Sequence, residues 1–82
     1  MTQRVSGTAS NHEILAKLGQ AIRARRQQMG MSQEALAHQS GIDRSHMGKI
    51  ERGERNVTLL NIQRVAKILD LPPSQLLASA GF

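Results

Sequence analysis

Apolar residues recur along this chain at the three- and four-residue spacing of helix faces, and no segment alternates with the period of two that is typical of strands. The first such face consists of Ile14, Leu15, Leu18, Ala21, Ile22 and Met29. Ser10 followed by Glu13 has the pattern of a capping box, so we expect this helix to open at Ser10. Gly30 is expected to end it.

Two short helices are expected next, each opened by a residue that can cap a helix N-terminus. Ser32 precedes the first, which is expected to end near Gly41. Asp43 precedes the second, which is expected to run to about Arg52 and to be closed by Gly53. Because the turn between them is short, these two helices must cross at a steep angle.

The C-terminal third is predicted to hold two further helices. Thr58 can cap the fourth helix, and Asp70 stands where a residue in the left-handed conformation usually ends a helix. Pro73 suits the first position of the fifth. The expected inner face of the fourth helix consists of Leu59, Ile62, Val65, Ala66 and Leu69, and that of the fifth of Leu76 and Leu77. The pattern predicts an all-α domain of five helices over residues 11–80, preceded by a flexible N-terminal arm at residues 1–10.

Composition narrows this picture. The chain has 82 residues, which suits one domain, and it has no cysteine, so disulfides and thiolate metal sites are excluded. Its one aromatic residue is Phe82, so the core must be aliphatic. No apolar run approaches the roughly 18 residues of a membrane span, and the first ten residues lack the apolar stretch of a secretory signal. We therefore expect a cytoplasmic protein without a membrane partner.

The charge balance favours a polyanionic partner without proving one. Eleven Lys and Arg residues against six Asp and Glu residues give a formal net charge of +5, and most of the cations are Arg. Each phosphate that a cation neutralises releases counterions, and a guanidinium can bind phosphate or guanine through two hydrogen bonds. An ordinary soluble surface with an excess of cations has the same composition, so the positions of the cations along the chain must distinguish the two cases.

Ala37 is small where the two short helices press against each other, and Gly41 lies in the turn, where positive φ is expected. The positions that must be buried carry Leu36, Ile42, Met47 and Ile50. The outer face of the second short helix is polar and basic, with Arg44, Ser45, Gly48, Lys49 and Arg52. The combination predicts a helix-turn-helix whose second helix enters the major groove of double-stranded DNA.

On these residues the chain resembles the Cro/repressor-like (XRE) helix-turn-helix family, from about Leu18 to Leu77. The matching segments are Arg23–Arg26, Met31–Ala37, Gly41–Ser45, Ile50–Gly53 and Ile62–Leu69. The phrases Asp43–Met47 and Glu51–Asn56 are also similar to the controller proteins of restriction–modification systems. The resemblance implies a compact five-helix lambda-repressor-like domain with its helix-turn-helix at residues 33–52. It also implies a sequence-specific transcriptional regulator, more often a repressor than an activator.

The resemblance implies a role for each site residue. Arg44, Ser45 and Lys49 match the base-reading positions, and Arg44 is expected to bind either guanine or a phosphate. The positions that match contacts with the DNA backbone are Gln33, Arg52, Arg55 and Asn56, and His46, which lies beside the base-reading face, is expected to flank the backbone as well. For Gln33 and His46 a plain surface role is the alternative, and the Arg55 position also takes part in sequence recognition in controller-like relatives. Arg26 and Glu51 match a structural ion pair, whereas Arg23 and Arg25 are expected on a solvated face.

Two features remain open at this point. Gly48 offers no side chain to a base and costs about 1 kcal/mol in helix stability, and close approach of the helix to the groove floor is one hypothesis for it. One small domain reads few bases, so we expect a homodimer on a palindromic operator. The expected interface consists of Leu76, Leu77 and Phe82; the alternative is that the two leucines only close the core.

Two other classes of function stay open: an antitoxin that also neutralises a toxin, and a protein-interaction adaptor of the same fold. An enzyme is not predicted, because the sequence has no nucleophile motif, paired carboxylates or phosphate loop. His12, His38 and His46 lack the spacing of metal ligands. We therefore expect no metal, no cofactor and no small-molecule ligand.

Overall fold

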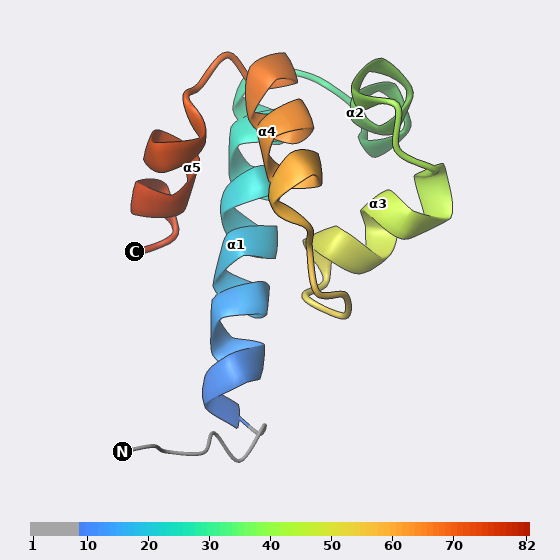
Figure 1. Cartoon of the computed structure of the whole chain (residues 1–82). Helices are drawn as coiled ribbons and strands as arrows, with labels where there is room; N and C mark the ends of the chain where they lie inside the picture. Colours follow the sequence, from blue (N-terminus) through green and yellow to red (C-terminus); the bar gives the residue numbers. More distant parts are fainter. Residues whose placement is uncertain (1–8) are drawn as a thin grey trace.

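The computed structural model describes residues 9–82, with side chains from residue 13 onward, and this part of the chain contains helices and turns but no strand. The helices are α1 (Ala9–Gln28), α2 (Gln33–Ser40), α3 (Arg44–Glu51), α4 (Leu59–Ile68) and α5 (Pro73–Ser79) (Figure 1). The predicted all-α fold of five helices is confirmed. Helix α1 already includes Ser10, so the expected opening at that residue is wrong, and residues 1–8 of the predicted arm lie outside the described residues.

Local chemistry sets most helix boundaries, as predicted. Ser32, Asp43 and Thr58 each accept a hydrogen bond from a backbone N–H of the helix that follows, at 3.0, 3.0 and 3.1 Å. These bonds satisfy donors that have no partner within the helix. Gly41 and Asp70 have φ values of 74° and 60°, the left-handed conformation expected after a helix end.

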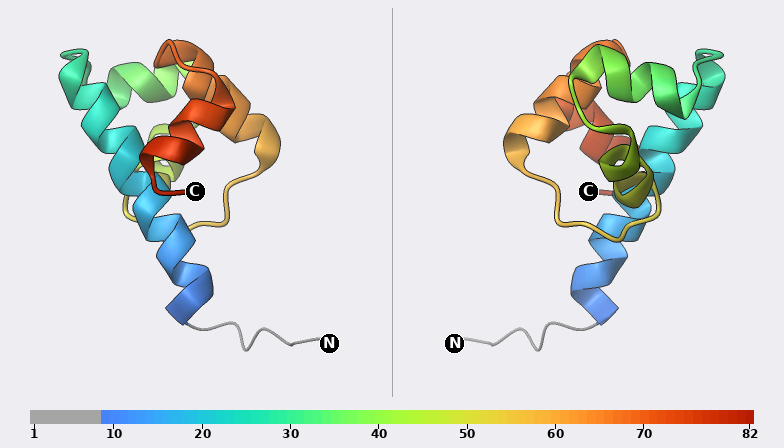
Figure 2. Two further views of the ribbon diagram at one scale, coloured as in Figure 1. Left: turned by 90° about the vertical axis from the view of Figure 1, so that its left-hand side faces the viewer. Right: turned by 90° about the vertical axis from the view of Figure 1, so that its right-hand side faces the viewer.

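Helix α1 is the long central element of the arrangement. Helices α4 and α5 pack against each other, and α5 also contacts α1, whereas α2 and α3 form the other side of the molecule (Figure 1). In the right-hand view of Figure 2, α2 lies across the page while α3 is seen nearly end-on, so the two cross steeply. This is the expected helix-turn-helix arrangement, held by contacts of α3 with α1 and of α2 with α4. Within residues 9–82 no helix is both long and apolar enough to cross a bilayer.

The core is aliphatic, as composition required. Its members are Leu18, Ile22, Leu36, Ala37, Ile42, Met47, Ile50, Ile62, Val65, Ala66, Leu69 and Leu76. Three residues expected on inner faces are exposed instead: Ile14 and Met29 by 40% each, and Leu59 by 76%. Ile14 lies in the first half of α1, Met29 directly follows the last residue of α1, and Leu59 is the first residue of α4. Periodicity marked the apolar side of each helix correctly but not how far the neighbouring helices cover it.

Arg25 ties α1 to the end of α4. We expected this side chain on a solvated face, but it is half-buried and its Nε donates a 2.9 Å hydrogen bond to the carbonyl oxygen of Leu69, the C-cap residue of α4. A cation there also opposes the negative end of the helix dipole. The expectation for Arg25 is therefore wrong, whereas Arg23 is exposed.

Helix α1 and the C-terminal end of α3 are in direct backbone contact. A Cβ on Gly19 would lie 2.5 Å from the carbonyl oxygen of Glu51 and 2.6 Å from that of Ile50. A Cβ on Gly53, which has φ of 74°, would lie 2.7 Å from Cα of Ala16. Because neither position has room for a side chain, the two glycines allow α3 to approach α1 at this crossing.

Candidate nucleic-acid interface

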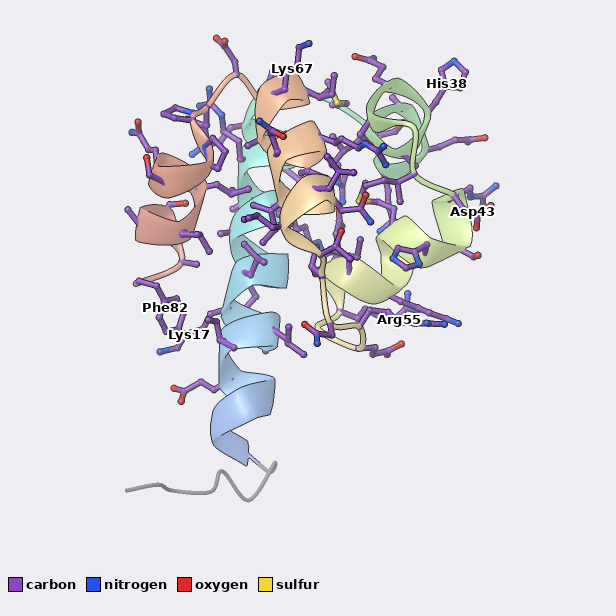
Figure 3. All side chains as sticks on the ribbon, in the orientation of Figure 1. Lys17, His38, Asp43, Arg55, Lys67 and Phe82 are labelled. Atoms are coloured by element: carbon purple, nitrogen blue, oxygen red, sulfur yellow. The ribbon has the colours of Figure 1, made fainter. Side chains whose placement is uncertain are left out.

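Helix α3 has one buried face and one polar face. Met47 and Ile50 are fully buried, while Arg44 and Ser45 are exposed and Lys49 is half-buried. Of the other residues predicted to contact DNA, Arg52, Arg55 and Asn56 are exposed and His46 is half-buried. Figure 3 places Asp43 and Arg55 on the α3 side of the molecule, away from Lys17 and Phe82.

A shallow hollow of about 570 Å³ lies between α3 and the start of α2. Its lining consists of Gln33, Asp43, Arg44, Ser45, Gly48, Lys49 and Arg52. The hollow therefore brings together all three predicted base-reading residues and two of the predicted backbone-binding residues. Its rim carries three cations and one carboxylate, so it is net basic. His46, Arg55 and Asn56 are not among the lining residues.

A buried network fixes the two helices that form the hollow. Arg26 donates two hydrogen bonds to the Glu51 carboxylate, Nε to Oε2 at 2.8 Å and a terminal nitrogen to Oε1 at 3.0 Å. A further nitrogen of Arg26 donates to the carbonyl oxygen of Met31 at 3.0 Å, and Nε2 of Gln33 donates to Oε1 of Glu51 at 3.0 Å. The side chains of Arg26 and Glu51 are 11% and 3% exposed. Hydrogen bonding to Glu51 raises the pKa of Arg26, so this guanidinium stays charged.

The ion pair that the sequence assigned to Arg26 and Glu51 is therefore present, and Gln33 joins it. The amide of Gln33 holds the first residue of α2 against the last residue of α3. This structural contact was not foreseen for Gln33, because nothing in the sequence relates it to Glu51 by a simple spacing. Binding of a phosphate by Gln33 stays a prediction.

Asp43 caps α3 and also holds the Ser45 side chain. Its Oδ2 accepts hydrogen bonds from the backbone N–H of Ser45 at 3.0 Å and from the Ser45 hydroxyl. The hydroxyl bond, followed by backbone bonds from His46 and Ser45, lowers the pKa of Asp43 below its ordinary value. Because the hydroxyl proton of Ser45 points to Asp43, the hydroxyl oxygen can still accept a hydrogen bond from another donor.

Gly48 leaves space that two polar side chains use. A Cβ at this buried position would lie 3.1 Å from a terminal nitrogen of Arg52 and 3.4 Å from Oε1 of Gln33. Both neighbours are the ends of flexible side chains, and both line the hollow. The mid-helix glycine was recognisable in the sequence, but its neighbours were not. Close approach of α3 to the groove floor at this point stays a prediction.

Two exposed carboxylates contact arginines of this surface. Arg52 donates to Glu54 from Nε at 3.0 Å and from a terminal nitrogen at 3.3 Å. This contact raises the pKa of Arg52 and lowers that of Glu54. Glu34 lies 3.9 Å from Arg44. Neither carboxylate was predicted to lie at the interface, although Glu54 follows Arg52 by two positions along the chain.

The expected dimer residues lie in different environments. Leu76 is fully buried in the core, so its expected place in a dimer interface is wrong: the packing of α5 on α1 and α4 leaves it no surface for a partner. Leu77 is half-buried against the same core. Phe82 is 55% exposed, and its ring centroid lies 5.7 Å from Nζ of Lys17 (Figure 3).

Exposed apolar side chains gather on the first turn of α4 instead. Leu59 and Leu60 are 76% and 53% exposed and border a hollow of about 520 Å³ together with Gln63 and Pro73. We call these two leucines the α4 patch. Two adjacent exposed leucines are unfavourable in water unless another surface covers them. The sequence had placed Leu59 in the core, so this surface was missed.

Comparisons with known proteins agree with this geometry. The family model described as Helix-turn-helix matches residues 22–76. Control protein C.BamHI of Bacillus amyloliquefaciens is 43% identical over 67 residues, which cover 80% of this chain and 83% of the relative. The crystal structure of the restriction-modification controller protein C.AhdI from Aeromonas hydrophila is 52% identical with a TM-score of 0.74, over 76% of this chain and 94% of that one. The biofilm regulator SinR, solved in complex with DNA, is 31% identical with a TM-score of 0.70, over 73% of this chain and 97% of that one.

Proposed function

This chain belongs to the helix-turn-helix family of DNA-binding transcription regulators, and from that premise we propose that it binds a palindromic operator as a homodimer and represses transcription as a controller-type regulator. The controller proteins among its relatives support the controller type. The observation that carries the proposal is the basic hollow along α3, where Arg44, Ser45 and Lys49 converge beside Gln33 and Arg52.

Two kinds of contact follow from the position of these residues. Arg44, Ser45 and Lys49 lie on the side of α3 that a major groove would receive, and Arg44 has the reach and donor geometry for a guanine. Arg52, Arg55 and Asn56 lie at or beyond the end of α3, where we assign them to the DNA backbone. His46 flanks the same helix and is assigned to the backbone as well.

The α4 patch supports the homodimer better than α5 does. The chain runs from the end of α3 through residues 52–58 directly into Leu59 and Leu60, so pairing through the patch would place two copies of α3 near a common axis. A two-fold axis there requires operator half-sites of matching symmetry, about one helical turn apart. We therefore assign the dimer interface to Leu59 and Leu60, and the C-terminal surface with Leu77 and Phe82 is the alternative that the test must separate from it.

The proposal is tested by selecting bound duplexes from a random pool and measuring the mass of the free protein in solution. A palindromic consensus together with a dimeric mass is expected. A non-palindromic site bound by a monomer would overturn the proposed mode of binding, and failure to bind any duplex above the non-specific level would overturn the function itself.

Replacing Arg44 by alanine is expected to weaken operator binding by about 1–3 kcal/mol and to relax the preference at one base position, because a bidentate guanine contact is lost. Binding is measured by titration against the selected operator and its single-base variants. Arg64→Ala is the matched control, since Arg64 is an exposed arginine of α4 that does not line the hollow. Equal weakening on every sequence would assign Arg44 to a phosphate instead.

Replacing Leu59 by aspartate is expected to give a monomer and to lower affinity for the full palindrome by about 100-fold, because the second half-site no longer gains from linkage to the first. The carboxylate would stand at the first position of α4, where it favours the helix, so the fold should persist. Sedimentation and operator titration measure both effects. Phe82→Asp is the control: a monomer from this variant and a dimer from Leu59→Asp would move the interface to the C-terminal residues.

A further inference from the structure

Four of the six acidic residues contact residues that we assign to DNA binding. Glu51 holds Gln33, and Asp43 holds Ser45. Glu34 lies beside Arg44, and Glu54 binds Arg52. The other two acids, Glu13 and Asp70, lie on α1 and after α4. Glu34, Asp43 and Glu54 are exposed, so half of the acidic side chains lie at the surface that would approach a polyanion.

These four carboxylates differ in what the fold needs from them. Glu51 is buried in the ion pair with Arg26, and Asp43 caps α3, so both stabilise the fold itself. Glu34 and Glu54 are exposed, cap no helix in the described residues, and pair only with exposed arginines. Exposed pairs of this kind contribute little to folding stability. Glu34 also lies in the first turn of α2, where its charge favours the helix, whereas Glu54 lies outside the helices. The effect of Glu54 should therefore appear in DNA binding rather than in folding.

The contact with Glu54 occupies the edge of Arg52 that a phosphate would use. Glu54 takes Nε and one terminal nitrogen of the guanidinium, while the other terminal nitrogen lies over Gly48. A phosphate binds the same pair of donors through two parallel hydrogen bonds. A phosphate can therefore reach this edge only after the carboxylate leaves, and the carboxylate repels it at close range.

We propose that Glu54, and more weakly Glu34, compete within the molecule for the DNA-binding arginines and thereby hold down the affinity for duplex DNA. The proposal rests on DNA binding by this surface. Glu34 has the smaller effect because it meets Arg44 at 3.9 Å, whereas Glu54 makes two hydrogen bonds with Arg52. Removing either carboxylate frees one cation for a phosphate.

The test is Glu54→Gln, which keeps the shape and removes the charge. We expect about threefold tighter binding to a labelled duplex at low salt, from the size of exposed ion-pair energies. Because Arg52 can then neutralise one more phosphate, the plot of log affinity against log salt should steepen by about 0.9. Fluorescence anisotropy titrations between about 50 and 200 mM salt measure both quantities. Glu34→Gln should give a smaller gain.

Two control experiments show whether the tighter binding comes from the release of Arg52. Glu13→Gln removes the same charge from an exposed pair, at 3.1 Å from Lys17 on α1, and should change the affinity much less. In a background of Arg52→Gln the gain from Glu54→Gln should disappear, because the competitor has no arginine to release. A gain that persists in that background, or no gain in Glu54→Gln itself, overturns the competition. If the unaltered protein binds no duplex, the proposed function is contradicted. If it binds DNA but Glu54→Gln brings no gain, only the competition is contradicted.

Discussion

Replacing Arg26 by methionine is expected to lower the free energy of unfolding by about 3–5 kcal/mol, because the substitution leaves the carboxylate of Glu51 buried without its cation. The Glu51 side chain is 3% exposed, and Arg26 supplies two of its hydrogen bonds. Among the residues that the structure describes, Gln33 alone would remain as a side-chain donor to Glu51. The carbonyl oxygen of Met31 would lose its Arg26 donor as well.

The loss is large because removing one partner leaves a buried charge without its counterion, whereas removing both partners leaves no buried charge. Desolvation of two charges offsets most of their attraction, so the intact pair adds little net stability. The double variant Arg26→Met with Glu51→Leu should therefore recover most of the stability that Arg26→Met loses. Small domains are stable by about 5–15 kcal/mol, so the single variant is expected to be close to its unfolding transition.

Urea titration and thermal melting of the single and double variants measure the effect. A loss of about 3 kcal/mol corresponds to a fall in Tm of at least about 12 °C for a domain of this size. Arg23→Met is the matched control, an exposed arginine of the same helix, and should shift stability by no more than about 0.5 kcal/mol. Equal losses at Arg23 and Arg26, or no recovery in the double variant, would contradict the role of the pair.

Replacing Gly19 by alanine is expected to destabilise the protein by about 2 kcal/mol. Overpacking costs about 3 kcal/mol at its upper range, and the better helix propensity of alanine returns about 1 kcal/mol. The upper range applies because the new methyl group would meet backbone oxygens of Ile50 and Glu51 at 2.6 and 2.5 Å, which no side-chain rotation can relieve. Helix α1 and the end of α3 must then separate.

The matched control is the same exchange at Gly48, also within a helix. There the nearest atom to the new methyl group is the end of the Arg52 side chain, at 3.1 Å, which can turn aside. Gly48→Ala should therefore keep or raise stability, by up to about 1 kcal/mol. Denaturant titration of both variants provides the comparison. A stable Gly19→Ala protein would show that the α1–α3 crossing has more freedom than its backbone distances indicate.

The parts of the fold that depend on neighbouring residues could be predicted from the sequence. Ser32, Asp43 and Thr58 cap the helices that follow them, and Gly41 and Asp70 adopt the left-handed conformation, because each acts within a few residues. The steep crossing of α2 and α3 followed from the short turn between two amphipathic segments.

What depends on distant residues could not be predicted in the same way. Leu59 and Leu76 both stand at apolar helical positions, yet one is exposed and the other is fully buried. Periodicity shows the apolar side of a helix but not which other helix covers it. The close approach at Gly19 was not predicted, because the sequence does not show which backbone faces a glycine within a helix.

The candidate site shows the same division. The polar face of α3 was readable from spacing, and the Arg26–Glu51 pair from the family pattern. The contacts of Gln33 with Glu51 and of Arg44 with Glu34 join residues separated by 18 and 10 positions, respectively, with no periodic relation. Such contacts arise only when α2 and α3 are docked, so they needed the structure.

The short segment that follows α3 has a consequence for the operator. The end of α3 approaches the backbone of α1 closely at Gly19 and Gly53, and this crossing fixes where the segment of residues 52–58 begins. In the proposed homodimer, residues 52–58 then set the distance between α3 and the partner subunit. A relative with a longer or shorter segment there would recognise half-sites at another spacing, even if every base-contacting side chain were the same.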